Sequence, residues 1–512
     1  MTSSATTVRR GTLAVLWIMA ATAVFRGNSI NYIIGPAATS FGLDGTGTQQ
    51  FKLVPNIGQL LVVFLAGLLA ERIGARRTLA WGSLGLMLGG LACSIAPGPI
   101  VMDFGLLVAA SGTSMILVAV FAVVGRRFHG TSDRARAFGI LATAMPIVSL
   151  LSPFICSWLV EGVSWRAATS LWAVFGAVAL LSALFGLEKE PVSSSRDEYV
   201  TPMLAGMLLV SAVGVLNEFN SSGLSLGVFI YAAVAVASVF GIVLMRRRLA
   251  RTSLNLAPIS AQIPLLMLVA IAVGTLTYQW YIGFLAFQNL FGMDDLEIAV
   301  AMIPTQILCI LAARLTPKVI VARGLRATAV YGTAISGLTC LLFLFVQEDQ
   351  SPVILSIIMA IYGAVATGVA VSVNNAAMNS LPSEHSGAMS AFRSASSAFG
   401  SAVTAVLMGA LLIGAYDASL SSQSEAAGLD STSSVAVGEA LNSGLSYSDA
   451  ATQVGVPESE VSTIADFSTA ALVDSLHVKS VLSAVFGLVA AGLLAAAMRR
   501  RKSDYDAEPA LT

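Results

Sequence analysis

The sequence predicts an all-α integral membrane protein with fourteen membrane-spanning helices and both termini in the cytoplasm. Composition, the length of the apolar runs and the placement of basic residues each point to this class. Of the 512 residues, 56% are hydrophobic and 11% are charged, whereas a soluble domain averages about 25% charged residues. A chain this apolar cannot bury its hydrophobic surface in one water-soluble globule.

Apolar runs long enough to cross a bilayer as helices, roughly 20 residues each, recur along the whole chain. The first is longer than one crossing needs, so we expect that helix to be tilted or broken. The runs cover approximately 13–40, 52–70, 78–97, 101–125, 138–160, 167–187, 201–218, 226–245, 263–288, 298–316, 327–346, 353–375, 388–414 and 480–498.

Basic residues concentrate in every second loop, for example in 72–77, 126–136, 246–251 and 499–502. An even number of spans places all these loops on the same side as both termini. Because cytoplasmic loops carry an excess of Lys and Arg, the pattern predicts that both termini are cytoplasmic. The opposite loops keep only three of the 28 basic residues: Lys52, Arg166 and Lys479.

One outer loop, 416–478, is much longer than the others. It is rich in Ser and Ala and carries carboxylates without any Lys or Arg. Part of it, 458–476, could form an amphipathic helix. We expect the loop to act as a spacer or a cap over the outer mouth, with direct handling of cargo as the alternative.

The sequence gives no sign of an enzyme, a metal site or a cofactor. The four Cys and three His residues are scattered, without metal-ligand or catalytic spacing. No phosphate-binding loop is present. With 28 acidic and 28 basic residues, the net charge does not suggest a nucleic-acid partner.

The loop GLLAERIGARR, 67–77, carries the most specific pattern. It resembles the signature loop of the major facilitator superfamily, G-x-L-x-D-R-x-G-R-R, with Glu in the Asp place and Ala75 in an Arg place. The resemblance implies that the loop locks two helices on the cytoplasmic side and helps set which side is open. The residues implied in this gating are Gly67, Glu71, Arg72, Gly74, Arg76 and Arg77.

Further stretches are similar to the fourteen-helix drug:proton antiporters of that superfamily, the exporters of quaternary ammonium compounds and other drugs. They include Phe284–Pro304, with Gln288, and Leu381–Val403. The resemblance implies the major facilitator fold, with two six-helix bundles and an extra helix pair between them. We expect boundaries at 1–187, 188–251 and 252–512, with the substrate site near mid-membrane between the halves.

Three positions depart from that branch. Arg26 stands where the first span has an Asp, and Val108 replaces the Arg of the fourth span. In the fifth span, SPFICS, 152–157, keeps only the Pro of a glycine-rich motif. Proton-coupled cation export is therefore less directly implied than the fold.

Arg26 lies in the middle of an apolar run and should avoid lipid, since a charge there costs about 2.5–3.5 kcal/mol on insertion scales. Asn28 and Asn31 surround the helix with polar groups at the same depth. Arg26 could bind an anionic headgroup or take part in coupling. The alternative is structural pairing with a carboxylate or with helix-end carbonyls.

Other polar or aromatic residues inside the spans are candidates for lining a substrate path. Each has a structural alternative: helix–helix contact for the Asn–Gln pair, the interfacial belt for the aromatic residues, and snorkelling for the second arginine. Beside Gln288, they are Asn56, Gln59, Tyr278, Trp280, Tyr281 and Arg393. The proton-site candidates are Asp103 and Glu218, near span ends.

We therefore expect a secondary active exporter of small amphiphilic molecules or drugs, coupled to protons and working by alternating access. The alternative is an exporter or flippase of a lipid or anionic natural product that uses Arg26. A non-transporting membrane sensor is a third hypothesis. We expect a monomer in the bilayer of the plasma membrane, from a bacterium of high G+C content.

Overall fold

The structure is a computed structural model that describes residues 2–43, 45–128, 130–188, 199–245, 279–348, 350–379, 386–442 and 447–499. All regular secondary structure in these ranges is helical. The first helices are α1 (Thr2–Ser40), α2 (Gly45–Arg72), α3 (Ala75–Ser94), α4 (Pro99–Arg127), α5 (Thr131–Ala142), α6 (Ala144–Gly162), α7 (Trp165–Gly186), α8 (Val200–Ser222) and α9 (Leu226–Leu244).

The carboxy-terminal part begins with helical residues 279–285, which lead into the π-helix η1 (Ala286–Leu290). The remaining elements are α13 (Asp295–Ala301), α14 (Ile303–Arg323), α15 (Leu325–Thr339), η2 (Cys340–Phe345), α16 (Pro352–Met378), α17 (Ser386–Ala426), α18 (Ser431–Asn442), α19 (Tyr447–Val454) and α20 (Glu458–Arg499).

Twelve helical stretches in the described residues are long and apolar enough to cross a membrane, and they coincide with twelve of the expected runs. The run 78–97 is helix α3, which packs between α4 and α7. The run 263–288 lies mostly outside the described residues. The count of fourteen and the orientation therefore stay predictions.

Two expected spans differ in detail from the prediction. The first is a single helix, α1, which runs unbroken past Gly27 and includes Pro36. The fifth is divided into α5 and α6 at Thr143, whose hydroxyl donates to the Ile140 carbonyl and accepts from Trp17 Nε1. These side-chain bonds offer the backbone an alternative to the helical ladder.

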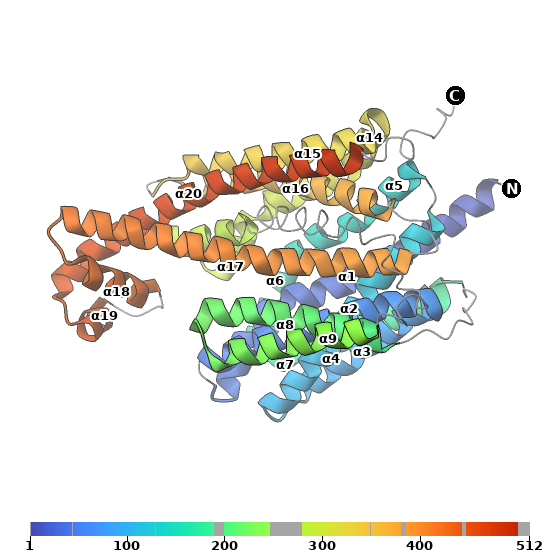
Figure 1. Ribbon diagram of the computed structural model, residues 1–512, viewed down its shortest axis with the longest axis horizontal. Coiled ribbons are helices and arrows are strands. Elements are labelled where there is room, and N and C mark those ends of the chain that lie inside the picture. The colour runs from blue at the N-terminus through green and yellow to red at the C-terminus, as the bar shows by residue number, and fades with distance from the viewer. Residues whose placement is uncertain are drawn as a thin grey trace.

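The helices form two groups with α17 running between them (Figure 1). One group contains α2, α3, α4 and α7, with the pair α8–α9 packed against α2; the other contains α14, α15, α16 and α20. Contacts between α17 and both α2 and α4, and between α14 and α5, join the groups. We call the end where α2, α4 and α14 finish in Arg72, Arg127 and Arg323 the basic end.

Three turns at the basic end have nearly the same backbone conformation. Gly74, between α2 and α3, has φ 87° and ψ 148°; Gly130, between α4 and α5, has φ 78° and ψ 154°; and Gly324, between α14 and α15, has φ 84° and ψ 152°. A positive φ is favourable only for Gly. The turn of the signature loop thus shares its conformation with the α14–α15 turn of the second group and with the α4–α5 turn.

At the opposite end, α17 and α20 extend beyond the bundle and carry α18 and α19 (Figure 1). Helices α17 and α20 have 41 and 42 residues, which corresponds to a length of about 60 Å at 1.5 Å per residue. This is twice the thickness of the roughly 30 Å hydrocarbon core of a bilayer. The expected outer loop is thus largely helical where described. Its core, which we call the cap core, consists of Tyr416, Leu420, Val437, Ala440, Ala450, Ala451, Val461, Ile464 and Ala471.

Candidate functional site

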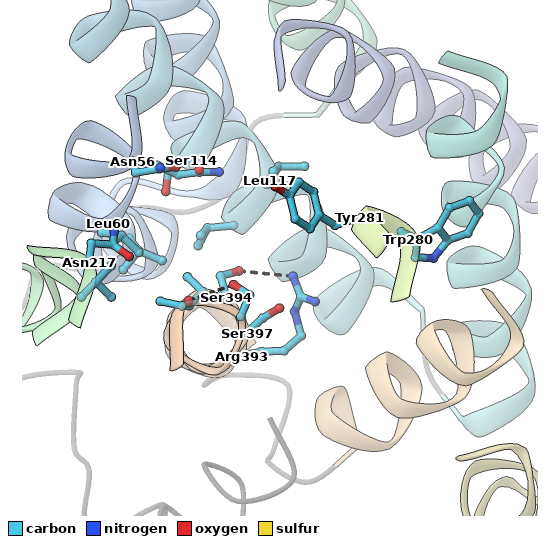
Figure 2. Close-up of a pocket in the computed structure, with 17 residues that line it drawn as sticks. Asn56, Leu60, Ser114, Leu117, Asn217, Trp280, Tyr281, Arg393, Ser394 and Ser397 are labelled. Atoms are coloured by element: carbon cyan, nitrogen blue, oxygen red, sulfur yellow. Dashed lines mark hydrogen bonds between the residues drawn. The ribbon is translucent and has the colours of Figure 1, made fainter. Parts of the chain in front are cut away.

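A cavity of about 700 Å³ lies between α2, α4, α8, residues 279–285 and α17. Figure 2 shows side chains from these separate segments pointing into it. Apolar side chains such as Leu60, Leu117 and Val213 form part of its wall. Its polar and aromatic lining comprises Asn56, Gln59, Ser114, Asn217, Trp280, Tyr281, Arg393, Ser394, Ser397 and Ser401.

The cavity brings together five of the predicted substrate or coupling residues, although they come from three separate segments. Tyr278 lies outside the described residues. Four other candidates, Arg26, Asn28, Asn31 and Gln288, do not line the cavity. The five that do are Asn56, Gln59, Trp280, Tyr281 and Arg393.

Arg393 is the single charged residue among the lining side chains. Its guanidinium donates to Asn374 Oδ1 at 2.8 Å and to Ser394 Oγ at 3.2 Å, and it lies 4.0 Å from the centroid of the Phe121 ring. Its Nε is buried without a hydrogen-bond partner among the described residues. The contacts orient the cation toward the protein interior instead of toward the membrane surface.

Arg26 is buried, with 4% of its surface exposed. Its guanidinium lies 5.6 Å from the Trp172 ring centroid, in α7. Trp172 in turn donates to Ser29 Oγ at 2.7 Å, and Phe25 packs edge-on against Phe175. Arg26 therefore faces the interior between α1 and α7, and it is not among the residues that line the cavity.

The two other candidates in α1, Asn28 and Asn31, differ in environment. Asn28 donates to Ser149 Oγ of α6 at 2.7 Å, which makes it a helix–helix contact. Asn31 is exposed. Gln288, in η1, is exposed as well.

Neither proton-site candidate lines the cavity. Asp103 accepts a hydrogen bond from Gln50 Nε2, and its Oδ1 is buried without a hydrogen-bond partner among the described residues. Glu218 accepts from Ser225 Oγ at 2.8 Å, in the turn between α8 and α9. Asp103 thus links α4 to α2, whereas Glu218 forms a local contact in the α8–α9 turn.

The signature loop joins α2 to the start of α17 at the basic end. Glu71 Oε1 accepts the backbone N–H of Ala388 at 2.7 Å, one of the first N–H groups of α17, which have no partner within the helix. The carboxylate also lies at the positive end of the helix dipole. A Cβ on Gly67 would stand 2.8 Å from the Gly387 oxygen and 2.6 Å from Ala391 Cβ, so only Gly allows this approach.

The arginines of the loop contact neighbouring helices of the first group. Arg72 lies 4.6 Å from the Tyr199 ring centroid, just before α8. Arg76 donates to the Leu184 carbonyl, in the last turn of α7, where carbonyls lack a partner within the helix. Arg77 is exposed.

A second set of contacts at the basic end, between α4–α5 and α16–α17, was missed from the sequence. Arg134 donates to the Met378 carbonyl at 3.3 Å and to Asn379 Oδ1. Arg126 donates to Ser386 Oγ at 3.1 Å, and Asn375 to the Thr131 carbonyl at 3.1 Å. Arginines near cytoplasmic loops fit the positive-inside pattern whether or not their side chains bind another helix. The sequence therefore offered no signal that these arginines hydrogen-bond to α16 and α17.

Several cavity residues were also missed, although a signal existed. Ser394, Ser397 and Ser401 follow the helical period along one face of an apolar helix, and all three line the cavity. Such a polar stripe indicates a face turned away from lipid. Ser114 and Asn217 are single polar residues in apolar helices and carry no comparable pattern.

The described residues contain no group of three His, Cys, Asp or Glu side chains that could hold a metal ion. The four cysteines are free and buried. The chemistry available in the cavity is therefore hydrogen bonding, aromatic contact and one cation.

Several known proteins are similar to this chain. Methylenomycin A resistance protein of Bacillus subtilis strain 168 is 26% identical over 231 residues, 45% of this chain and 47% of that protein; the match thus spans about half of that relative. Multidrug efflux pump LfrA of Mycolicibacterium smegmatis is 24% identical over 480 residues, covering 88% of this chain and 89% of the pump.

A solved structure extends the similarity to the fold. The human organic anion transporter MFSD10 superposes with a TM-score of 0.61 at 10% sequence identity, covering 95% of this chain and 99% of that one. The family model of the Major Facilitator Superfamily matches residues 16–405. That range includes the signature loop, the cavity and the contacts at the basic end. The chain belongs to the major facilitator superfamily.

Proposed function

We propose that this multi-pass membrane protein is a secondary active transporter that exports small amphiphilic molecules of drug type by alternating access. The cavity between α2, α4, α8 and α17 carries the proposal. The names of relatives with resistance or efflux functions support it. Both relatives come from bacteria, which supports a plasma-membrane location, and the mycobacterial source of LfrA supports a high-G+C origin. The protein is proposed to act as a monomer.

The contacts at the basic end suggest how access alternates. The cavity residues Gln59 and Ser397 are separated from that end by the Gly67–Gly387 approach and by the hydrogen bond from Ala388 to Glu71. Opening the basic end requires these contacts to break. We propose that they do so when the halves 1–187 and 252–512 rock about the cavity, with 188–251 forming the extra helix pair.

The charge of the cavity bears on the substrate class. No Asp or Glu is among its 17 lining residues, and Arg393 is the single cation. A desolvated cationic drug needs a counter-ion, whereas an anionic or neutral amphiphile does not need a carboxylate. Trp280 and Tyr281 offer aromatic surface for the apolar part of such a substrate.

The second candidate function is therefore export of a lipid or an anionic natural product. The position of Arg393 in the cavity favours this candidate. Arg26, which first suggested it, lies elsewhere, between α1 and α7. Anion recognition is accordingly proposed for Arg393, and Arg26 remains a candidate for coupling.

Proton antiport is proposed as the energy source. Asp103 and Glu218 remain the proton-site candidates, and both would act from outside the cavity lining. A coupling group outside the cavity must act through a movement of the helices that carry it. α4 and α8, which hold these residues, both contribute to the cavity wall.

The test uses proteoliposomes with an imposed pH gradient and two matched fluorescent amphiphiles, one anionic and one cationic. Wild type is expected to transport the anion at a rate that depends on the imposed pH gradient. Arg393→Gln is expected to lose this transport. Arg323→Gln, at an exposed position on α14, is the matched control and should transport normally.

Other outcomes discriminate between the alternatives. Transport of the cation at the same rate by wild type and by Arg393→Gln would favour the ordinary multidrug function. Transport indifferent to the gradient would remove proton coupling. Binding of either probe without movement would indicate a sensor instead of a transporter.

A further inference from the structure

A second hollow lies where α5 meets α14, away from the cavity. It has a volume of about 440 Å³ and shares no lining residue with the cavity. We call it the basic groove. Its lining residues are Arg136, Gly139 and Ile140 of α5 and Ala313, Arg314, Pro317, Lys318, Val321 and Ala322 of α14.

The floor of the basic groove is formed by close packing of the two helices. A Cβ added to Gly139 would stand 2.5 Å from Pro317 Cγ and 2.6 Å from the Ala313 oxygen. Only Gly permits the helices to come this near. The groove is thus formed in the state in which α5 and α14 are packed together.

Three cations meet in the basic groove. Arg314 and Lys318 are four residues apart on α14 and therefore share a face, and Arg136 approaches from α5. None of the three forms a hydrogen bond or an ion pair with another described residue. No carboxylate lines the groove. Like charges held together without a counter-ion repel, so the groove is complementary to an anion.

The depth of these cations matches a lipid headgroup. Arg314 and Lys318 lie on either side of residue 316, where the apolar run 298–316 ends, and Arg323 ends α14 less than two turns beyond Lys318. Their stems can carry the charges to the interface. The groove residues Ile140 and Val321 are 41% and 59% exposed, an apolar surface that suits acyl chains.

We propose that the basic groove binds the phosphate of an anionic phospholipid from the leaflet next to the basic loops. A free anion would use the three cations but would leave the apolar wall bare. An uncharged lipid would use the wall but would leave the cations without a counter-ion. Basic pockets between membrane helices at this depth suit anionic headgroups.

The proposal is tested by native mass spectrometry of the full-length protein in detergent, with phosphatidylglycerol or phosphatidylcholine of identical acyl chains. Wild type is expected to retain phosphatidylglycerol preferentially. Arg314→Gln/Lys318→Gln should weaken this binding by about fivefold for each charge removed. Arg136→Gln, on α5, removes one charge and should weaken phosphatidylglycerol binding by about fivefold. Because this is a separate variant, it still tests the proposal if the double variant misfolds.

The matched control is Arg323→Gln, which removes an exposed charge of the same helix outside the groove and should bind as wild type does. Equal retention of both lipids, or equal binding by the groove variants and the control, would overturn the proposal. Displacement of the lipid by millimolar inorganic phosphate would assign the groove to a free anion instead.

Discussion

Arg26 is a cation held among apolar and aromatic side chains. Its Nε and Nη2 have no hydrogen-bond partner among the described residues, and Trp172 is its ring contact. Even the replacement of a complete buried ion pair by apolar residues of similar volume is often neutral or stabilising by about 1–4 kcal/mol, and Arg26 has no ion-pair partner among the described residues. We therefore expect Arg26→Met to keep or raise the thermal unfolding midpoint of the detergent-purified protein.

The matched control for Arg26 is Arg166→Met. Arg166 donates to the Ala96 carbonyl at 3.0 Å and lies 4.2 Å from the Trp165 ring centroid, so its loss should lower the midpoint. A larger loss for Arg26→Met than for Arg166→Met would contradict our assignment of Arg26 as poorly partnered. Lost transport with an unchanged midpoint would support a role of Arg26 in coupling.

Glu71 stabilises the basic end through a single carboxylate. It accepts the N–H of Ala388, and capping contacts at helix starts contribute about 0.5–2 kcal/mol. Glu71→Ala should therefore shift the equilibrium toward opening at the basic end by about 2- to 30-fold. The measurement is the rate at which a membrane-impermeant maleimide, added from that side, labels a Ser397→Cys variant.

Glu71→Gln separates the hydrogen bond from the charge. Gln can still accept from Ala388 but no longer interacts with the helix dipole, a contribution of about 0.3–1 kcal/mol. Its labelling rate should fall between those of wild type and Glu71→Ala. An unchanged rate in Glu71→Ala would show that this contact does not control access.

At the level of helices, the approach of α2 to α17 depends on Gly67. A methyl group there would stand 2.8 Å from the Gly387 backbone oxygen, so the helices must separate. Overpacking of this kind costs typically about 1–3 kcal/mol. Gly67→Ala should therefore raise labelling of Ser397→Cys from the basic side by about fivefold or more.

Gly492→Ala is the control for Gly67, because a Cβ at Gly492 meets nothing within 4 Å. It should leave the labelling rate unchanged. If Gly67→Ala also left it unchanged, the Gly67–Gly387 approach would not be the barrier between the cavity and the basic end.

Apolar runs predicted the helices well because hydropathy reports contact with lipid. They underestimated α17 and α20, whose expected spans were 388–414 and 480–498 but which extend from Ser386 to Ala426 and from Glu458 to Arg499. The extra turns are amphipathic, because they bury apolar residues in the cap core, and they lie outside the bundle (Figure 1). A run ends where lipid contact ends, not where the helix ends.

The residues of the candidate site could be predicted only in part, because hydropathy distinguishes lipid from the protein interior but does not distinguish one interior space from another. A polar residue inside a span indicates that it avoids lipid, and this made Asn56, Gln59 and Arg393 candidates for a substrate path; all three line the cavity. It does not indicate which interior space the residue faces. Arg26 and Asn28 meet α7 and α6 instead of the cavity, and only the packing of the helices distinguishes these cases.

On the scale of the whole molecule, the two ends of the bundle are built differently. The basic end is held by contacts between helices far apart in sequence, as in Arg134 with Asn379 and Glu71 with Ala388. The other end carries a cap whose core shares no residue with the cores of the bundle. An end that opens and closes needs contacts that can break, whereas a separate cap can stay folded while the helices below it move.

This separation predicts that the cap is dispensable for folding of the bundle. Tyr416 and Ser468 share a hydrogen bond, and Ser419 donates to Asp474 at 2.6 Å, so α17 and α20 run side by side below the cap. A Gly/Ser linker of about six residues can join such antiparallel neighbours. Replacing 421–466 with it should leave the thermal unfolding midpoint of the bundle nearly unchanged.

Transport by the linker variant then decides between the two roles of the cap. Unchanged uptake rates and substrate preference in proteoliposomes are expected for a spacer. A shuffled cap sequence is no control, because it exposes the apolar cap core; Gly428→Ala, strained by a φ of 77° within the cap, disturbs the cap without shortening it. If the linker variant kept its midpoint but lost transport of one amphiphile class, the cap would handle cargo directly, and the acidic surface above the cavity would become part of the transport path.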